Sequence, residues 1–565
     1  MAPTAQRSRP KPLLTRPEIS TLISNGHKIV IVNDLVLKTD AWLPYHPGGD
    51  KAILHMVGRD ATNEVRAFHS AETLEFMRRY AIGRVEEGKW VDFVPPIQGG
   101  VFAFNDKVAE DQEMDGEDDV VETTGSSSEG EMSEEPSPVF DGVGLRRRRG
   151  SSAGTSSTSL ESLHLDRSAT PPKADSILRD SPKTMIGEDL SAFPDLDAAT
   201  QKAIIQKYRA LDARIRAAGL YDCNYTAYLF EILRYTTLAA LSYYTLRQGY
   251  YTLSAIFLGL LWHQLVFTVH DAGHMGITHN YHIDTFIGIL IADFIGGLSV
   301  CWWKRNHNVH HLVTNSPAHD PDIQHMPFFA ITPKFLQNLT STYYDRPMPF
   351  DRFARWTLKY QHYLYYPILL FGRFNLYFLS WEYILLNKGP RKGPARHHRW
   401  LELIGQIFFW YWFGYRLLYL SLPSASARIA YVLISHFVTT PVHVQITLSH
   451  FAMSTADLGV AESFPQRMLR TTMDISCPPW LDFLHGGLQF QAVHHLLPRV
   501  PRHNLRACVG FVKEFCEEVG IPYAVYGFVE GEGRVLGRLG EVAEQVRILG
   551  ECAGSLGVKD VFEAH

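Results

Sequence analysis

Cysteine is scarce in this chain of 565 residues, and its six cysteines are scattered without a Cys-x-x-Cys pair. This spacing favours neither a disulfide framework nor a thiolate zinc site. Strong net charge is also lacking, because the formal value is -5, and this gives no reason to expect nucleic acid as a partner. The N-terminus contains no continuous apolar run, so we predict no secretory signal and expect membrane insertion to depend on internal segments.

Composition divides the chain into three parts. Residues 15–92 alternate β-rich and helical patterns around a turn-like Asn33-Asp34, and we predict a small α+β domain. Residues 105–190 are acidic and rich in serine, too polar to offset the entropy of ordering them, and we predict a disordered linker. The role of this linker stays open: its basic run at 146–149 suits a solvated tether, a phosphorylation switch or a contact with anionic lipid.

The third part, residues 195–535, contains several apolar segments, and a helix needs about 20 apolar residues to span the hydrocarbon core. We predict an all-α integral-membrane domain with about four transmembrane helices, because four spans leave the histidine-rich segments on one face. The stretch 282–300 is short and carries Asp293, so the alternative for this segment is that it enters only the membrane interface. An amphipathic helix at 193–222 is predicted to lead to the membrane. The apolar segments are 225–246, 249–268, 282–300, 360–381, 400–421 and 427–448.

Two histidines of the first part suit a haem site. His46 lies in a His-Pro-Gly-Gly turn, and His69 follows the helical stretch that opens with Asp-Ala-Thr. Two neutral imidazoles can ligate haem iron from opposite faces, which gives an electron-transfer centre that does not bind dioxygen. The glycines of the turn allow a close approach to the haem edge. Asp60 or Thr62 is expected to cap the following helix.

These features resemble the cytochrome b5 family over about residues 15 to 90. The resemblance implies a cytochrome b5-like haem-binding domain in which His46 and His69 hold haem b. His55 is off the family's ligand pattern and is predicted to be a surface or packing residue.

The remaining histidines, among the 26 in the chain, crowd into three clusters. In the first, an i, i+4 spacing puts two imidazoles on one face of a helix, so both can reach one metal. In the second, two histidines again share a face, while the third points about 100° further round and can address a second metal. The clusters are His270 and His274, then His307, His310 and His311, and last Gln491, His494 and His495.

Imidazole ligates iron, zinc, copper and nickel, so the ligand type does not choose the metal. A zinc hydrolase usually needs three protein ligands and an open position, and seven clustered histidines exceed that need. The sequence therefore predicts a binuclear site beside the membrane.

These clusters resemble the three histidine boxes of the integral-membrane fatty-acid desaturase and hydroxylase superfamily over about residues 195 to 530. The resemblance implies a cytosolic di-iron cap, two Fe, and O2 as co-substrate, with the box residues and Gln491 as the catalytic set. Gln491, where many members have histidine, and the haem domain together fit the front-end desaturases, and the acidic insert is most like fungal sphingolipid Δ8 desaturases. The family needs a further ligand: His450 is our candidate, and His443 is the alternative. Gln491 could bind metal, hold a bound water or shape the substrate channel.

The resemblance predicts O2-dependent desaturation of a long-chain sphingoid base in ceramide, with an NADH-cytochrome b5 reductase feeding the haem domain. It also implies a multi-pass protein of the endoplasmic reticulum membrane, with both redox sites facing the cytosol. Alternatives are a front-end Δ5/Δ6 acyl-lipid desaturase and a di-iron lipid hydroxylase, which the boxes do not separate. A haem-only electron carrier and a metal transporter fit the clustered histidines less well. His279, His282, His319 and His325 are expected near the boxes but not as ligands.

Overall fold

The computed structural model describes residues 11–102 and 191–555. These residues all belong to one unit, which comprises residues 1–104 and 179–565. The predicted linker at 105–190, with its basic run and serines, lies outside the described residues.

The N-terminal domain is built on a three-stranded antiparallel sheet in the order β1-β2-β3 (Ile29–Val32, Leu35–Lys38 and Ala81–Arg84). Asn33 and Asp34 join the first two strands with φ angles of 48° and 61°, so the predicted turn is confirmed. Asparagine and aspartate tolerate this left-handed conformation better than most residues, which explains why they lie here. Four helices complete the domain: α1 (Arg16–Ser24), α2 (Asp50–Leu54), α3 (Thr62–Phe68) and α4 (Ala71–Met77).

The helical stretch after Ala61 is two helices rather than one. Helix α3 ends at Phe68, and Ser70 caps the next helix by accepting a hydrogen bond from the Thr73 amide at 3.3 Å. Ala61, rather than Asp60 or Thr62, occupies the N-cap position of α3, although the Asp60 carboxylate still accepts a hydrogen bond from the Thr62 amide at 3.1 Å. The break between α3 and α4 leaves His69 in extended backbone between two helices.

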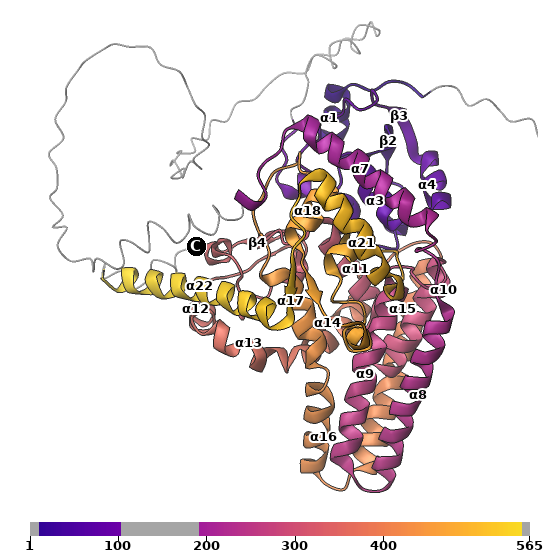
Figure 1. Cartoon of the computed structure of the whole chain (residues 1–565), viewed down its shortest axis with the longest axis vertical. Helices are drawn as coiled ribbons and strands as arrows, with labels where there is room; N and C mark the ends of the chain where they lie inside the picture. Colours follow the sequence, from indigo (N-terminus) through magenta and orange to yellow (C-terminus); the bar gives the residue numbers. More distant parts are fainter. Residues whose placement is uncertain (1–10, 103–190, 556–565) are drawn as a thin grey trace, which may run out of the picture. The chain divides into compact units, whose positions relative to one another are not determined.

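Long helices dominate the second domain (Figure 1). Helix α8 (Tyr225–Arg247) and helix α9 (Tyr251–Gly273) pack as a hairpin, and α16 (Ala425–Phe437) packs along α9. Helix α15 (His398–Phe409) continues into a π-helical segment, η9 (Trp410–Tyr419). The apolar segment predicted at 400–421 is therefore helical throughout most of its length.

Membrane-spanning helices are confirmed at the level of length and composition. In the described part of the chain, Tyr251–Gly273 and Ala425–Phe451 are long and apolar enough to cross a bilayer. The pair Tyr281–Ile295 and Val300–Leu312 passes the same test together but bends by 119°, so it is a broken span or a re-entrant loop. That bend agrees with the expectation that 282–300 need not cross the membrane.

The apolar segment expected at 360–381 is divided between α13 (Gln361–Leu369) and α14 (Gly372–Leu385). Helix α13 packs against α22 (Phe528–Ser555), and Gln361 donates a hydrogen bond to the Leu539 carbonyl at 2.8 Å. Helix α7 (Ala198–Ala217), the expected amphipathic helix, buries one face against α21 (Arg502–Val519). The other elements are α10 (Tyr281–Ile289), η5 (Leu290–Ile295), α11 (Val300–Leu312), α12 (Arg352–Lys359), α17 (Thr440–Phe451), α18 (Phe464–Thr471), α19 (Asp482–His485), α20 (Gln491–Leu496), β4 (Thr340–Ser341), β5 (Arg346–Pro347), β6 (Asp474–Ser476) and β7 (Val525–Gly527).

One apolar cluster joins the N-terminal domain to α11. Val309, Leu312 and Val313 are buried in the same cluster as Met56 and Ala61 of the N-terminal domain. Polar contacts flank this cluster: Arg305 pairs with Asp50 at 2.7 Å, and Lys51 pairs with Asp345 at 2.6 Å. Helix α11 thus belongs to the packing of both domains.

Candidate functional site

His46 and His69 face each other across a gap, with ring centroids 6.3 Å apart. The Nδ1 atom of His46 donates to the Gly49 carbonyl at 2.6 Å, and that of His69 donates to the Val65 carbonyl at 2.9 Å. Burial lowers the pKa of His69 to about 4, so its imidazole stays neutral, as ligation requires. Each Nε2 atom therefore remains free for metal. The pair fits the axial ligation of a haem iron.

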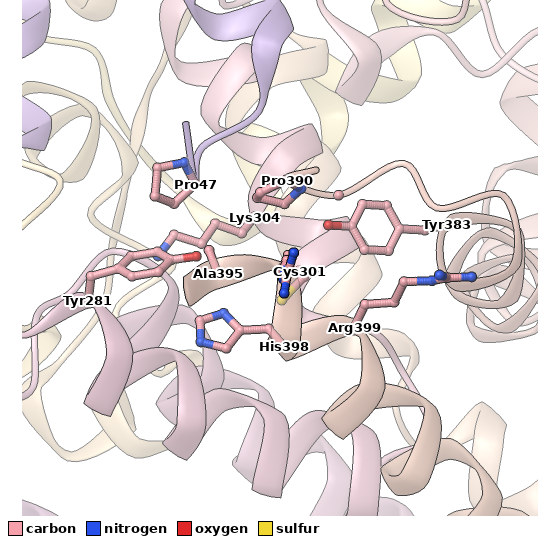
Figure 2. Close-up of a pocket in the computed structure, with 11 residues that line it drawn as sticks. Pro47, Tyr281, Cys301, Lys304, Tyr383, Pro390, Ala395, His398 and Arg399 are labelled. Atoms are coloured by element: carbon pink, nitrogen blue, oxygen red, sulfur yellow. The ribbon is translucent and has the colours of Figure 1, made fainter. Parts of the chain in front are cut away.

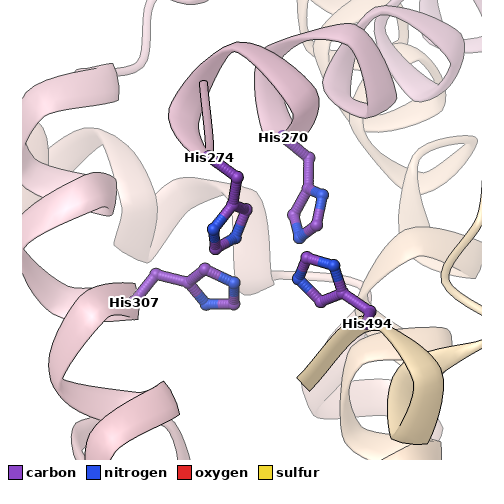
Figure 3. Close-up of side chains that lie close together, drawn as sticks. All are labelled: His270, His274, His307 and His494. Atoms are coloured by element: carbon purple, nitrogen blue, oxygen red, sulfur yellow. The ribbon is translucent and has the colours of Figure 1, made fainter. Parts of the chain in front are cut away.

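The first histidine set comprises His270, His274, His307 and His494, whose ligand nitrogens all lie within 4.8 Å of one another. Figure 3 shows the four rings pointing toward a common centre from three helices. His270 and His274 come from the end of α9, His307 from α11 and His494 from α20. The i, i+4 spacing on α9 therefore acts as predicted and directs two imidazoles to one point.

The second histidine set comprises His310, His450 and His495, also within 4.8 Å of one another. Helix α17 supplies His450, whereas His443 is not part of any such group among the described residues. His311 lies between the sets: its Nε2 is 3.1 Å from that of His307, and its ring stacks on His495 at 4.0 Å. His494 and His495, adjacent on α20, thus address different sets. On α11 the two histidines in different sets are His307 and His310, which were expected to share a face, while the ring of His311 lies between the sets.

The donor atoms of these sets fit metal cations. The Nε2 atoms of His270, His274, His494 and His495 and the Nδ1 atom of His311 are buried without a hydrogen-bond partner among the described residues. Burial, with the neighbouring His307 and His310, holds the pKa values of His494 and His495 well below their usual range, so both rings are neutral donors. Buried nitrogens without partners are costly unless something satisfies them. Two bound cations would satisfy both groups.

Two protein families match parts of this chain, and proteins from several organisms are similar to nearly all of it. The family described as "Fatty acid desaturase" matches residues 250–527, and "Cytochrome b5-like Heme/Steroid binding domain" matches residues 15–86. The chain is 58% identical to a Delta 8-(E)-sphingolipid desaturase of Emericella nidulans, over 98% of both chains. It is 46% identical to a protein of the same description from Candida albicans, over 96% of this chain and 97% of that one.

The chain belongs to the fatty acid desaturase family. A Delta(8)-fatty-acid desaturase of Helianthus annuus is also similar, with 37% identity over 64% of this chain and 78% of its own. The predicted family resemblance, the oxidoreductase class and the fused haem domain are confirmed by these matches. The cofactors of the desaturase are haem and a di-iron pair, with dioxygen as co-substrate.

Two carboxylates of the desaturase were missed by sequence reasoning. His310 Nδ1 donates to Asp320 at 2.9 Å, and His307 Nδ1 lies 3.4 Å from Asp322. Such carboxylate–imidazole pairs fix the ring orientation and tautomer, and leave Nε2 to the metal. Both acids follow α11: Asp320 is the N-cap of the short 3-10 helix η6 (Pro321–Ile323) and Asp322 lies within it, too short a helix for a period to mark them. Their one signal is an Asp-Pro-Asp run that begins nine residues after His311, the end of the second histidine box.

The other predicted residues lie around the two sets. Gln491 is buried at the start of α20, one turn before His494. The four histidines expected near the boxes form no part of any metal-ligating group among the described residues. His279 shows why, because both its ring nitrogens are hydrogen-bonded to backbone carbonyls at 2.8 and 2.9 Å. His55 is buried beside Gln98 in the haem domain. Of the two predicted roles, surface or packing, the structure therefore supports packing.

A separate pocket lies next to the haem-ligand turn (Figure 2). Pro47, which follows His46, lines it together with Tyr281, Tyr383 and Lys304. The Nζ atom of Lys304 is buried, lies 4.3 Å from the centre of the Tyr281 ring, and has no hydrogen-bond partner among the described residues.

Proposed function

We propose that the chain desaturates the long-chain sphingoid base of a ceramide at the Δ8 position, with electrons delivered through the fused haem domain. The observation that carries this proposal is the 58% identity, over 98% of both chains, to a protein described as a Delta 8-(E)-sphingolipid desaturase. The substrate in that description is the relative's. Its transfer to this chain is supported by a likeness that covers the haem domain and every histidine cluster.

We assign His46 and His69 to the haem and the two histidine sets to two irons. In this assignment His270, His274, His307 and His494 hold one iron. His310, His450 and His495 hold the other. His311 lies within reach of both, and the pairing of His307 and His310 with aspartates supports their place among the ligands. We leave Gln491 to the channel or to a bound water.

When bound, the haem supplies single electrons, and the irons use them with dioxygen to remove two hydrogens from an unactivated methylene pair. The protein's own part is geometric. Neutral imidazoles hold the irons, Asp320 and Asp322 fix two of those rings, and burial keeps water from the centre. The bond that is oxidised would then depend on where the lipid chain lies against the histidine sets.

Four membrane spans are proposed: α8, α9, α15 with η9, and α16 with α17. Two of these spans, α8 and α15 with η9, are less apolar than the helices named above as able to cross a bilayer. Large apolar side chains are nevertheless exposed along both, which suits contact with lipid. They include Leu229, Phe230, Leu233, Tyr243 and Tyr244 on α8, and Trp400, Ile404, Ile407, Tyr411 and Tyr415 on α15 and η9. This arrangement would carry the α9 and α17 histidines to the same membrane face and form a di-iron cap.

We further propose that this face is cytosolic, in the endoplasmic reticulum, and that a cytochrome b5 reductase using NADH reduces the haem. The domain limits we propose are 15–92 for the haem domain, 105–190 for the linker and 195–535 for the desaturase domain. A tethered donor raises its effective concentration at the acceptor, which is a reason for the fusion.

The test is expression in a yeast that lacks sphingoid-base unsaturation, with lipid profiling by mass spectrometry. A His494→Ala variant is the matched control, because it removes one proposed ligand and leaves the haem domain intact. A ceramide population lighter by two hydrogens, absent from the control, supports the proposal. A gain of one oxygen would indicate a hydroxylase, and unchanged sphingolipids with newly unsaturated fatty acids would indicate an acyl-lipid desaturase.

A further inference from the structure

Helix α11 carries chemistry on one face and packs against the haem domain with the other. Its histidines His307, His310 and His311 point into the two sets. Val309, between these histidines in sequence, and Leu312, directly after them, are buried in the cluster shared with the haem domain. A helix of 3.6 residues per turn can present both faces within one short stretch.

One aromatic contact links the haem domain to the histidines of the metal centre. Phe68 precedes the haem-ligand His69, and its ring meets that of His311 edge-on, with centroids 5.6 Å apart. His311 in turn stacks on His495 and lies 3.1 Å from His307. A continuous line of van der Waals contact therefore runs from the residue beside the haem ligand to both histidine sets.

We propose that Phe68 is the positioning residue of an electron path within a single chain, from the His69 side of the haem to His311 and both metals. The proposal rests on the ligand assignment of the proposed function. Electron tunnelling weakens steeply with distance, and an aromatic ring that is next to His69 in sequence and in contact with His311 shortens the gap between the two redox centres. The ion pairs of Asp50 with Arg305 and of Lys51 with Asp345 hold the domains in this register.

Each transfer moves one electron. The haem iron is oxidised from ferrous to ferric, and one iron of the pair is reduced from ferric to ferrous. Two transfers supply two of the four electrons that reduce dioxygen to two waters. The lipid gives up the other two with two hydrogens, and two further protons come from solvent.

The experiment follows haem oxidation directly in the full-length protein loaded with haem and iron. One electron equivalent of dithionite is mixed in without oxygen, and the decay of ferrous-haem absorbance reports transfer to the irons. We expect Phe68→Leu to slow this decay by roughly ten- to hundredfold, as small losses of reacting geometry do. Phe68→Trp, which keeps an aromatic ring at this position, should retain most of the wild-type rate of haem oxidation. Phe76→Leu, a change of another half-buried phenylalanine that packs on Trp42 within the haem domain, leaves it unchanged.

Two further readouts separate a path from a merely structural role. The haem reduction potential, and the hydrogen–deuterium exchange of residues 300–312 in iron-free protein, should be the same in Phe68→Leu and the wild type. Increased exchange would show that the ring only holds the domains together and would overturn the path.

A wild-type decay rate in Phe68→Leu, or a decay that speeds up with protein concentration, would also overturn the path. Either result, with ceramide still desaturated, leaves the proposed function standing. A wild-type chain that binds no iron would overturn both.

Discussion

Two histidines on α17 offer the sharpest test of the metal assignment at the residue scale. His443 and His450 are seven residues apart, so they lie about 10 Å apart along the helix axis, and only His450 reaches the second set. We predict that His450→Ala lowers bound iron by about half and reduces desaturation to background, because one iron loses a ligand. Metal analysis of the purified protein measures this.

His443→Ala is the matched control, on the same helix and of the same size. It should keep its iron and most of its activity. Loss of iron from His443→Ala, with His450→Ala unaffected, would contradict the assignment of the second set.

Asp320 lies behind a ligand rather than among the ligands. Its carboxylate is fully buried and accepts a hydrogen bond from His310. Asp320→Asn should therefore weaken iron binding by about 10- to 100-fold, the usual effect of removing such an orienting partner, while the haem spectrum is unchanged. Titration with a competing chelator measures the affinity. Wild-type iron affinity in Asp320→Asn would show that the pair does not orient His310.

At the scale of elements, Asp474 ties strand β6 to helix α20. Its carboxylate accepts hydrogen bonds from the Ala492 amide at 2.7 Å and from the Tyr523 hydroxyl. Burial raises its pKa from 3.8 to about 7. Above about pH 4 the unfolded chain releases this proton while the folded chain keeps it, so the free energy of unfolding falls between about pH 4 and about pH 7.

Asp474→Asn should flatten that part of the stability profile, because the asparagine side chain does not titrate. Thermal unfolding of detergent-solubilised protein at pH 4.5 and pH 7 checks this. Equal pH dependence in Asp474→Asn and the wild type would show that the carboxylate does not control it.

Element-level prediction from the sequence succeeded where a local period was strong. The helical spacing of His270 and His274 and the turn at Asn33-Asp34 depend only on residues close by in sequence, so a local pattern was enough to predict them. The apolar stretch at 360–381 was harder to interpret, because α13 packs on α22, more than 150 residues away in sequence. The break at His69 was missed although its signal is local, since Ser70 is an N-cap residue within an otherwise continuous helical pattern.

The site followed the same rule. The box histidines were named from their spacing and the family resemblance, and His450 as the further ligand that the family needs. The structure gathers them into one region, and their role as metal ligands stays a prediction. Asp320 and Asp322 were not named, since acidic residues in a polar loop carry no period. The contact of Phe68 with His311 was also beyond reach, because the two residues belong to different domains and are about 240 positions apart in sequence.

At the scale of the whole molecule, the register between the domains depends on paired charges. Lys51 is buried and donates to the Thr342 carbonyl and to Asp345, while Asp345 is 71% exposed. Lys51→Glu should therefore weaken docking by more than the roughly 1 kcal/mol of an exposed pair, since it places a buried carboxylate against Asp345 and the Thr342 carbonyl. Slower haem oxidation with an unchanged haem spectrum is the expected result.

The charge-swapped double variant Lys51→Glu with Asp345→Lys should recover much of that rate. If the swap recovers nothing, the pair does not set the register.

The central claim is that one chain carries a haem donor and a two-iron centre built from two histidine sets. The ratio of non-haem iron to haem in the purified full-length protein tests this claim most directly. The account predicts a ratio of two, falling to about one in His450→Ala. A ratio of one in the wild type, or zinc in place of iron, would contradict it.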